Sequence, residues 1–95
     1  MQESDIEKRF KTKIKKMGGL CLKWVSPGTR GVPDRIVLLP GGKMYLVEMK
    51  RPGGVCSPVQ KLLHKKIESL GTRVHVVASD EEADRFLEEW AHEIT

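Results

Sequence analysis

Residues 31–50 read GVPDRIVLLPGGKMYLVEMK, and this stretch decides the fold. Two apolar runs flank a glycine pair, with acidic residues near the start of the first run and the end of the second. The layout predicts a β-hairpin that carries Asp34, Glu48 and Lys50 at its open end. Side chains two apart on a strand share a face, so Glu48 and Lys50 are neighbours.

The length of the turn decides whether Asp34 joins this pair. A three-residue loop at 40–42 places Asp34 opposite Glu48, and a bulge reaches the same arrangement by another route. A two-residue loop at 41–42 would instead oppose Asp34 to Met49 and separate the two acids. Three-residue hairpins with a glycine in the left-handed position are common, so the arrangement with facing carboxylates is available.

Two carboxylates that face each other repel, so a fold that places them together must contain something that stabilises them. A divalent cation such as Mg²⁺ prefers hard oxygen ligands and relieves this repulsion. A lysine beside it, here Lys50, can hold a water or stabilise charge on a phosphate. The alternative is an ordinary Glu48–Lys50 ion pair on a solvated strand end, which is the commoner case for an isolated Glu-x-Lys. Asp34 at the matching register and the otherwise apolar strands favour the metal site.

Composition indicates one small domain over residues 1–95 that favours a polyanionic partner. The 95 residues include 17 Lys plus Arg against 13 Asp plus Glu, a net charge of +4. No long apolar run predicts a membrane span, and the first residues are too charged for a secretory signal. Cys21 and Cys56 lack metal-type spacing, which is typical of idle thiols in a reducing cytosol.

The first element predicted is a helix from Asp5 to Met17, capped by Ser4. Glu7 completes a capping box with Ser4, which gives it a sufficient structural role. Basic residues cover much of this helix. Lys11 and Lys15 belong to this basic run, which fits contact with backbone phosphates and a solvated face equally well.

A strand over 20–25 follows, with Trp24 expected in the core. The next loop contains Thr29 and Arg30, which are placed to touch a phosphate, although loops carry arginine for solubility as often. Later patterns predict a helix over 58–70, a strand over 73–78 and a last helix capped by Ser79.

The 58–70 helix begins with Ser57 as cap and Gln60 as its capping-box partner. We expect its apolar residues to be buried against the sheet: Val59, Leu62, Leu63, Ile67 and Leu70. The predicted order is helix, three strands, helix, strand, helix. This is an α/β fold with a mixed sheet flanked by helices, whose last strand runs parallel to its neighbour.

Gly-Val-Pro-Asp at 31–34, Glu-x-Lys at 48–50 and Gln60 together resemble a known family. It is the VRR-NUC (virus-type replication-repair nuclease) domain of the PD-(D/E)XK nuclease superfamily, and the resemblance spans residues 6–86. It implies a restriction-endonuclease-like core of order α-β-β-β-α-β-α and a metal-dependent DNA endonuclease. The implied catalytic residues are Glu7, Asp34, Glu48, Lys50 and Gln60.

The resemblance also implies a cofactor, Mg²⁺ or Mn²⁺, held by Asp34, Glu48, the Met49 carbonyl and Glu7, the last directly or through water. Lys50 would activate the attacking water, and Gln60 would orient Lys50 or the substrate.

The implied partner is DNA, with branched or four-way junction DNA as one substrate class and a homodimer as the assembly. We expect an intracellular protein of a viral or bacterial host cell that does not bind membranes. The residues expected to contact DNA are Lys11, Lys15, Thr29, Arg30 and Arg51. Two other classes stay open: a binding module that keeps the fold without cutting, and a small basic interaction domain.

Overall fold

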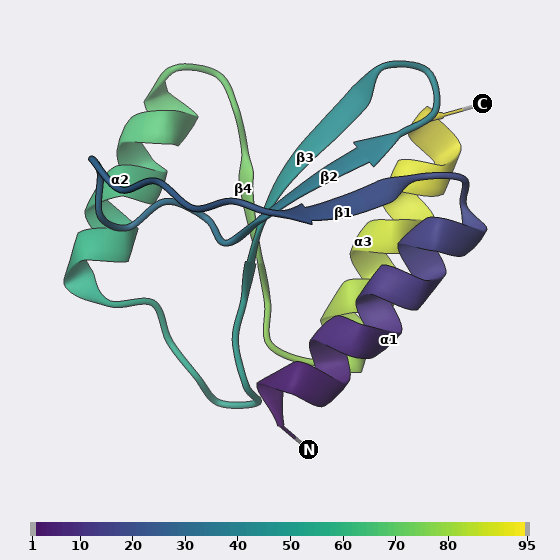
Figure 1. Cartoon of the computed structure of the whole chain (residues 1–95), viewed down its shortest axis with the longest axis horizontal. Helices are drawn as coiled ribbons and strands as arrows, with labels where there is room; N and C mark the ends of the chain where they lie inside the picture. Colours follow the sequence, from purple (N-terminus) through teal and green to yellow (C-terminus); the bar gives the residue numbers. More distant parts are fainter. Residues whose placement is uncertain (1, 95) are drawn as a thin grey trace.

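The structure is a computed structural model and describes residues 2–94 (Figure 1). Its elements are α1 (Glu3–Lys16), β1 (Leu20–Lys23), β2 (Arg35–Leu39), β3 (Lys43–Met49), α2 (Pro58–Ser69), β4 (Val74–Val77) and α3 (Asp80–Glu93). The order predicted from the sequence is therefore confirmed. None of the helices within 2–94 has the length and apolar character needed to cross a bilayer.

The four strands form one mixed sheet in the order β1-β2-β3-β4. The first three strands pair antiparallel, and β4 joins β3 in parallel after the α2 crossover. A tight turn reverses the direction of the chain and so joins antiparallel strands. Two parallel neighbours therefore need a longer crossover connection, here α2.

The hairpin of β2 and β3 has the three-residue loop. Leu39 pairs with Lys43 at the tip, and the ladder continues in register down to Arg35 and Val47. The loop glycines have φ values of 86° and 75°, a left-handed conformation that side chains rarely adopt. One step beyond the ladder, this register sets Asp34 opposite Glu48.

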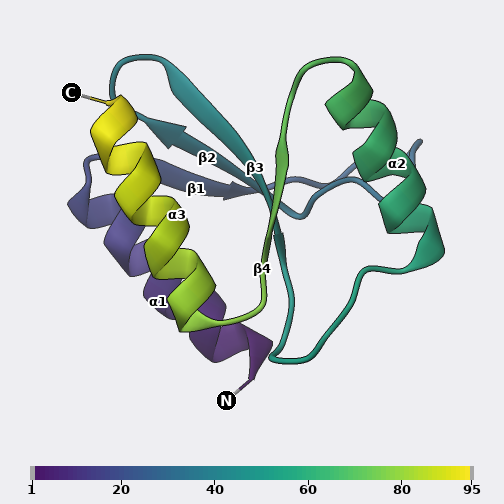
Figure 2. The ribbon, with the colours of Figure 1, turned by 180° about the vertical axis from the view of Figure 1, so that it is seen from behind.

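Helices α1 and α3 lie side by side on one face of the sheet, and α2 lies on the other, as both views show (Figures 1 and 2). The core is between the sheet and the α1–α3 pair, where Phe10 and Trp90 meet edge to face with centroids 6.1 Å apart. Strand residues on the core face include Val37, Val47 and Met49, all without exposed surface. Asp34 and Glu48 alternate with these residues, so they belong to the α2 face.

Ion pairs also join α1 to α3. Asp84 accepts hydrogen bonds from Arg9 Nη2 and Lys13 Nζ, each at 2.8 Å. These two cations hold the pKa of Asp84 down at about 2. Part of the basic run on α1 therefore forms ion pairs with α3 within the protein.

Helix α1 begins two residues earlier than predicted. Its N-cap is Gln2, whose backbone N–H donates to the Asp5 carboxylate at 3.0 Å. Ser4 lies inside the helix, so the predicted capping box of Ser4 and Glu7 is wrong. Glu7 is thereby left without a capping role.

The α2 face is covered less than predicted. Leu62 and Leu70 of α2 are 72% and 75% exposed, and the buried residue of this helix is His64. On the sheet, Leu22 is 45% exposed, and Trp24 is only half-buried. The predicted core position of Trp24 is therefore wrong, as is the predicted burial of Val59, Leu62 and Leu70, because α2 covers only the β3–β4 end of this face. Leu63 and Ile67 of the same helix are half-buried.

Candidate active site

Asp34 and Glu48 form a pair of acids at the open end of the hairpin. Asp34 Oδ1 accepts a hydrogen bond from the Met49 backbone N–H at 3.1 Å, which fixes the carboxylate against β3. Burial, and then the charge of Glu48, raise the pKa of Asp34 to about 7, well above its ordinary value. The sequence left two turn lengths open, and the three-residue turn of the structure is the one that brings the two acids together.

Lys50 and Gln60 hold one oxygen of the Glu48 carboxylate. Gln60 Nε2 donates to Glu48 Oε2 at 3.1 Å, and Lys50 Nζ lies 3.4 Å from the same oxygen. Lys50 Nζ also donates to Gln60 Oε1 at 3.0 Å, which closes a triangle of three side chains. The lysine therefore has a fixed position at the end of β3.

Gln60 performs both tasks that the sequence suggested for it. Its Oε1 accepts from the Ser57 backbone N–H at 2.9 Å, and its own N–H donates to Ser57 Oγ at 3.2 Å, so the capping box is present. The same amide reaches Lys50 and Glu48. The cap thus fixes the first turn of α2 against the acids.

The second oxygen of Glu48 is unsatisfied within the part of the chain that the structure describes. Glu48 is 3% exposed, and its Oε1 has no hydrogen-bond partner there. His64 Nε2 lies 3.9 Å from this oxygen, and it is also buried and without a hydrogen-bond partner among the described residues. Burial lowers the pKa of His64, so this ring is neutral near pH 7 and does not cancel the charge of Glu48.

Pro33 limits the backbone pairing at the same place. Continuing the hairpin register by two residues sets Pro33 opposite Met49. Facing residues at such a position exchange N–H and C=O bonds, but proline has no N–H to give. The Met49 N–H donates to Asp34 Oδ1 instead. A register continued to this point would give the Met49 carbonyl no N–H from Pro33.

Glu7 lies near the acids without joining them. It forms an ion pair with Arg35, whose side chain alternates with that of Asp34 and so points to the α1 face. The charge of Glu7 still contributes to the raised pKa of Asp34. No three Asp, Glu, His or Cys side chains within 2–94 are grouped to hold a metal by themselves. A cation would therefore rest on Asp34, Glu48 and the Met49 carbonyl, with Glu7 acting through water.

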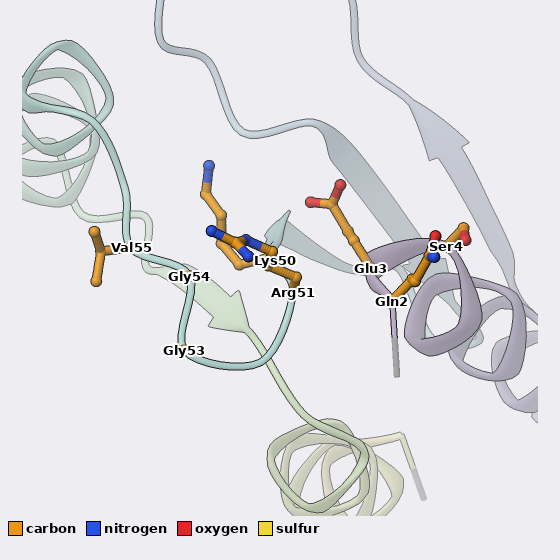
Figure 3. Close-up of a pocket in the computed structure, with 8 residues that line it drawn as sticks. All are labelled: Gln2, Glu3, Ser4, Lys50, Arg51, Gly53, Gly54 and Val55. Atoms are coloured by element: carbon orange, nitrogen blue, oxygen red, sulfur yellow. The ribbon is translucent and has the colours of Figure 1, made fainter.

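Two hollows meet at Lys50. The first, the glycine-loop hollow of about 830 Å³, lies between the start of α1 (Gln2, Glu3, Ser4) and the loop that contains Gly53 and Gly54. The side chains of Lys50 and Arg51 lie between these two walls (Figure 3). Arg51, one of the predicted DNA contacts, therefore lies next to the candidate site.

The second, the tryptophan hollow of about 620 Å³, is lined by residues between Trp24 and Val32, by Lys50 and by the start of α2. Thr29 and Arg30 line it, so these two predicted DNA contacts share a hollow with Lys50 and Gln60. Lys11 and Lys15 are exposed on α1 and line neither hollow.

Sequence reasoning missed two residues of this site. Arg35 directly follows Asp34, and its alternation onto the α1 face was a usable signal for a partner of Glu7. His64 lies four residues after Gln60, one helical turn further along the same face. That spacing was a usable signal for a residue beside the acids.

Comparison with known proteins agrees with this geometry. No family model matches the sequence. A curated relative, "Putative nuclease p44" of Acyrthosiphon pisum secondary endosymbiont phage 1, is 44% identical over 81 residues, which cover 85% of this chain and 87% of the relative. A solved structure described as a VRR_NUC domain superposes with a TM-score of 0.85 at 31% identity, covering 93% of this chain and 96% of the other. With the relative and the fold in agreement, the chain belongs to the VRR-NUC nuclease family.

Proposed function

We propose that the protein is a metal-dependent endonuclease that hydrolyses phosphodiester bonds in DNA. The observation that carries the proposal is the buried, unsatisfied Oε1 of Glu48. The other oxygen of this carboxylate lies 3.4 Å from Lys50 Nζ, and the charge of Glu48 acts on Asp34. An unpaired carboxylate oxygen in a protein interior is costly unless a ligand binds it. Membership of the nuclease family supports a phosphodiester substrate.

Mg²⁺ or Mn²⁺ fits the donors at this site. Asp34, Glu48 and the Met49 carbonyl offer only hard oxygen atoms, which both ions prefer. Waters would complete the shell, and Glu7 would hold one of them. When bound, the metal supplies positive charge that lowers the pKa of a bound water and neutralises charge on the phosphate.

Lys50 would orient the attacking water and the scissile phosphate. An ammonium has three donors, of which one reaches Gln60 and another points to Glu48. The remaining donor can bind a water or a phosphate oxygen. Because Gln60 fixes its position, Lys50 would stabilise developing negative charge without first reorganising.

For the assembly we propose a homodimer that acts on branched DNA such as a four-way junction. The uncovered part of the α2 face supports a partner copy. Leu20 pairs with Leu38 across β1 and β2, Leu38 pairs with Met44 across β2 and β3, and all three side chains are exposed. A twofold contact through this face would bury them and leave two active sites in one particle.

A binding module that never cuts is the alternative. Pure binding does not require two acids beside a phosphate, since like charges weaken the contact. The facing pair of Asp34 and Glu48 therefore favours hydrolysis over binding alone.

Replacing Lys50 or Asp34 should abolish cutting. We expect the wild type with Mg²⁺ or Mn²⁺ to cleave at least one of supercoiled plasmid, linear duplex and four-way junction. Lys50→Ala should slow cleavage by about a hundredfold or more, since a positioned donor has an effect of that order. Asp34→Asn should be as slow, because it removes the negative charge of a metal ligand while keeping the shape of the side chain. Gel assays of initial rates measure both.

Lys43→Ala is the matched control, since Lys43 is an exposed lysine on the same strand at the far end of the hairpin. It should cleave like the wild type. Equal cleavage by Lys50→Ala and Lys43→Ala would refute the role of Lys50. A wild type that binds DNA but cuts none of the substrates with either metal would favour the binding module.

Metal affinity should fall as the pH is lowered through 7. The pKa of Asp34 is raised to about 7, so below this pH the metal competes with a proton on its own ligand. Calorimetric titration with Mn²⁺ should give roughly tenfold weaker binding near pH 6 than near pH 8. Binding of equal strength at both values would contradict this assignment.

Without metal, the same carboxyl should make stability depend on pH. Its folded-state pKa lies above the unfolded value, so the folded state holds the extra proton. The resulting stabilisation is complete below about pH 4 and is lost as the pH rises through 7. In EDTA, the urea stability of the wild type should therefore fall toward pH 8 relative to Asp34→Asn. Parallel pH profiles would show that Asp34 titrates normally.

Placing a charge on the open sheet face should break the dimer. Leu38→Glu puts a carboxylate at the centre of the exposed row, so we expect monomers at micromolar concentration by sedimentation velocity. Leu62→Glu, which changes an exposed leucine of α2 outside that row, should remain dimeric. A wild type that sediments only as a monomer, alone and with DNA, would refute the homodimer.

A further inference from the structure

Trp24 lies in the same row of the sheet as the two acids. Its backbone N–H donates to the Asp34 carbonyl at 2.9 Å, which extends the pairing of β1 and β2 by one residue. The register of the next hairpin then sets Asp34 opposite Glu48. Residues facing each other across neighbouring strands share a face, so Trp24, Asp34 and Glu48 form one line across the sheet.

Core packing does not account for this indole. Trp90, the other tryptophan of the chain, is 1% exposed within the α1–α3 core. Trp24 is half-buried on the opposite face and lines the tryptophan hollow. Its aromatic surface is thus presented beside the acids.

The walls of this hollow are held close together. Gly31 has φ of 89°, and a Cβ built at this position would lie 2.9 Å from the Val59 carbonyl oxygen. The loop after β1 therefore packs directly on the first turn of α2, where only glycine fits. This contact fixes the loop that contains Arg30 relative to Gln60.

The two hollows at Lys50 differ in chemistry. The glycine-loop hollow contains Glu3 and no aromatic residue among the described residues that line it. The tryptophan hollow combines an indole and valine side chains with the cations Arg30 and Lys50, and none of the described residues that line it is acidic. A flat apolar wall together with positive charge matches a nucleotide, whose base is flat and whose phosphate is negative.

We propose that the tryptophan hollow receives an unpaired nucleobase next to the scissile phosphate. Trp24 stacks on the base, and Arg30 binds the adjoining phosphate. This inference rests on the proposed action on DNA and narrows its substrate class. Bases inside a duplex are stacked and paired, so the protein should prefer DNA whose nucleotides are already unpaired at the cleavage point, as at a branch or a frayed end.

The direct test uses the fluorescence of Trp24 in EDTA, where no cleavage occurs. Titrating the wild type with a single-stranded oligothymidine should quench part of the emission, because Trp24 stacks on a base. Trp24→Phe should lose this change, since the remaining tryptophan is buried in the core. A signal of the same size in Trp24→Phe would overturn the proposal.

Binding affinities give the second readout. Trp24→Ala should weaken binding to the single strand and to a four-way junction by about tenfold, while duplex binding changes less than about twofold. Leu22→Ala is the matched control, because Leu22 shares the face of Trp24 but does not line the hollow. Equal loss on single-stranded and duplex DNA would overturn the base subsite in favour of general DNA contact.

These results separate the subsite from the nuclease proposal. A wild type that shows quenching dependent on Trp24 but never cuts would support the base subsite and refute hydrolysis. A wild type that cuts while Trp24→Ala cleaves and binds every DNA equally well would support hydrolysis and overturn the subsite.

Discussion

The turn of three residues between β2 and β3 is the constraint on which the site depends. Because side chains alternate along a strand, a turn shorter by one residue would move Asp34 out of line with Glu48. The Met49 backbone N–H donates to the Asp34 carboxylate at the same place. One backbone choice thus brings together two carboxylates and the last residue of β3 at the end of a sheet.

Much of this arrangement was readable from the sequence. Alternation and turn residues predicted all seven elements in order, and the glycine pair at 41–42 made the correct register available. The capping box of Ser57 and Gln60 located the start of α2 and hence the amide beside Lys50. These features are local, since each depends on residues within one turn or one hairpin.

The features that sequence analysis missed depend on which surfaces meet in space. Ser4 is a better cap than Gln2 by propensity, but α1 extends by two residues, and Glu7 pairs with Arg35 instead of capping. Trp24 and Leu62 have the periodicity of core residues, yet α2 covers only one end of its face. Periodicity identifies an apolar side without saying whether anything packs on it, so the uncovered half of the sheet was not predictable.

The attachment of α1 to α3 has a consequence for the order of synthesis. Helix α1 contacts residues of α3 that are translated 71 to 80 positions later, through Phe10, Arg9 and Lys13. Until α3 has been made, the apolar side of α1 lacks the part of its packing surface that α3 provides, and such distant contacts form late in folding. A nascent or truncated chain would therefore hold the hairpin and its acids on a sheet whose core face is still open.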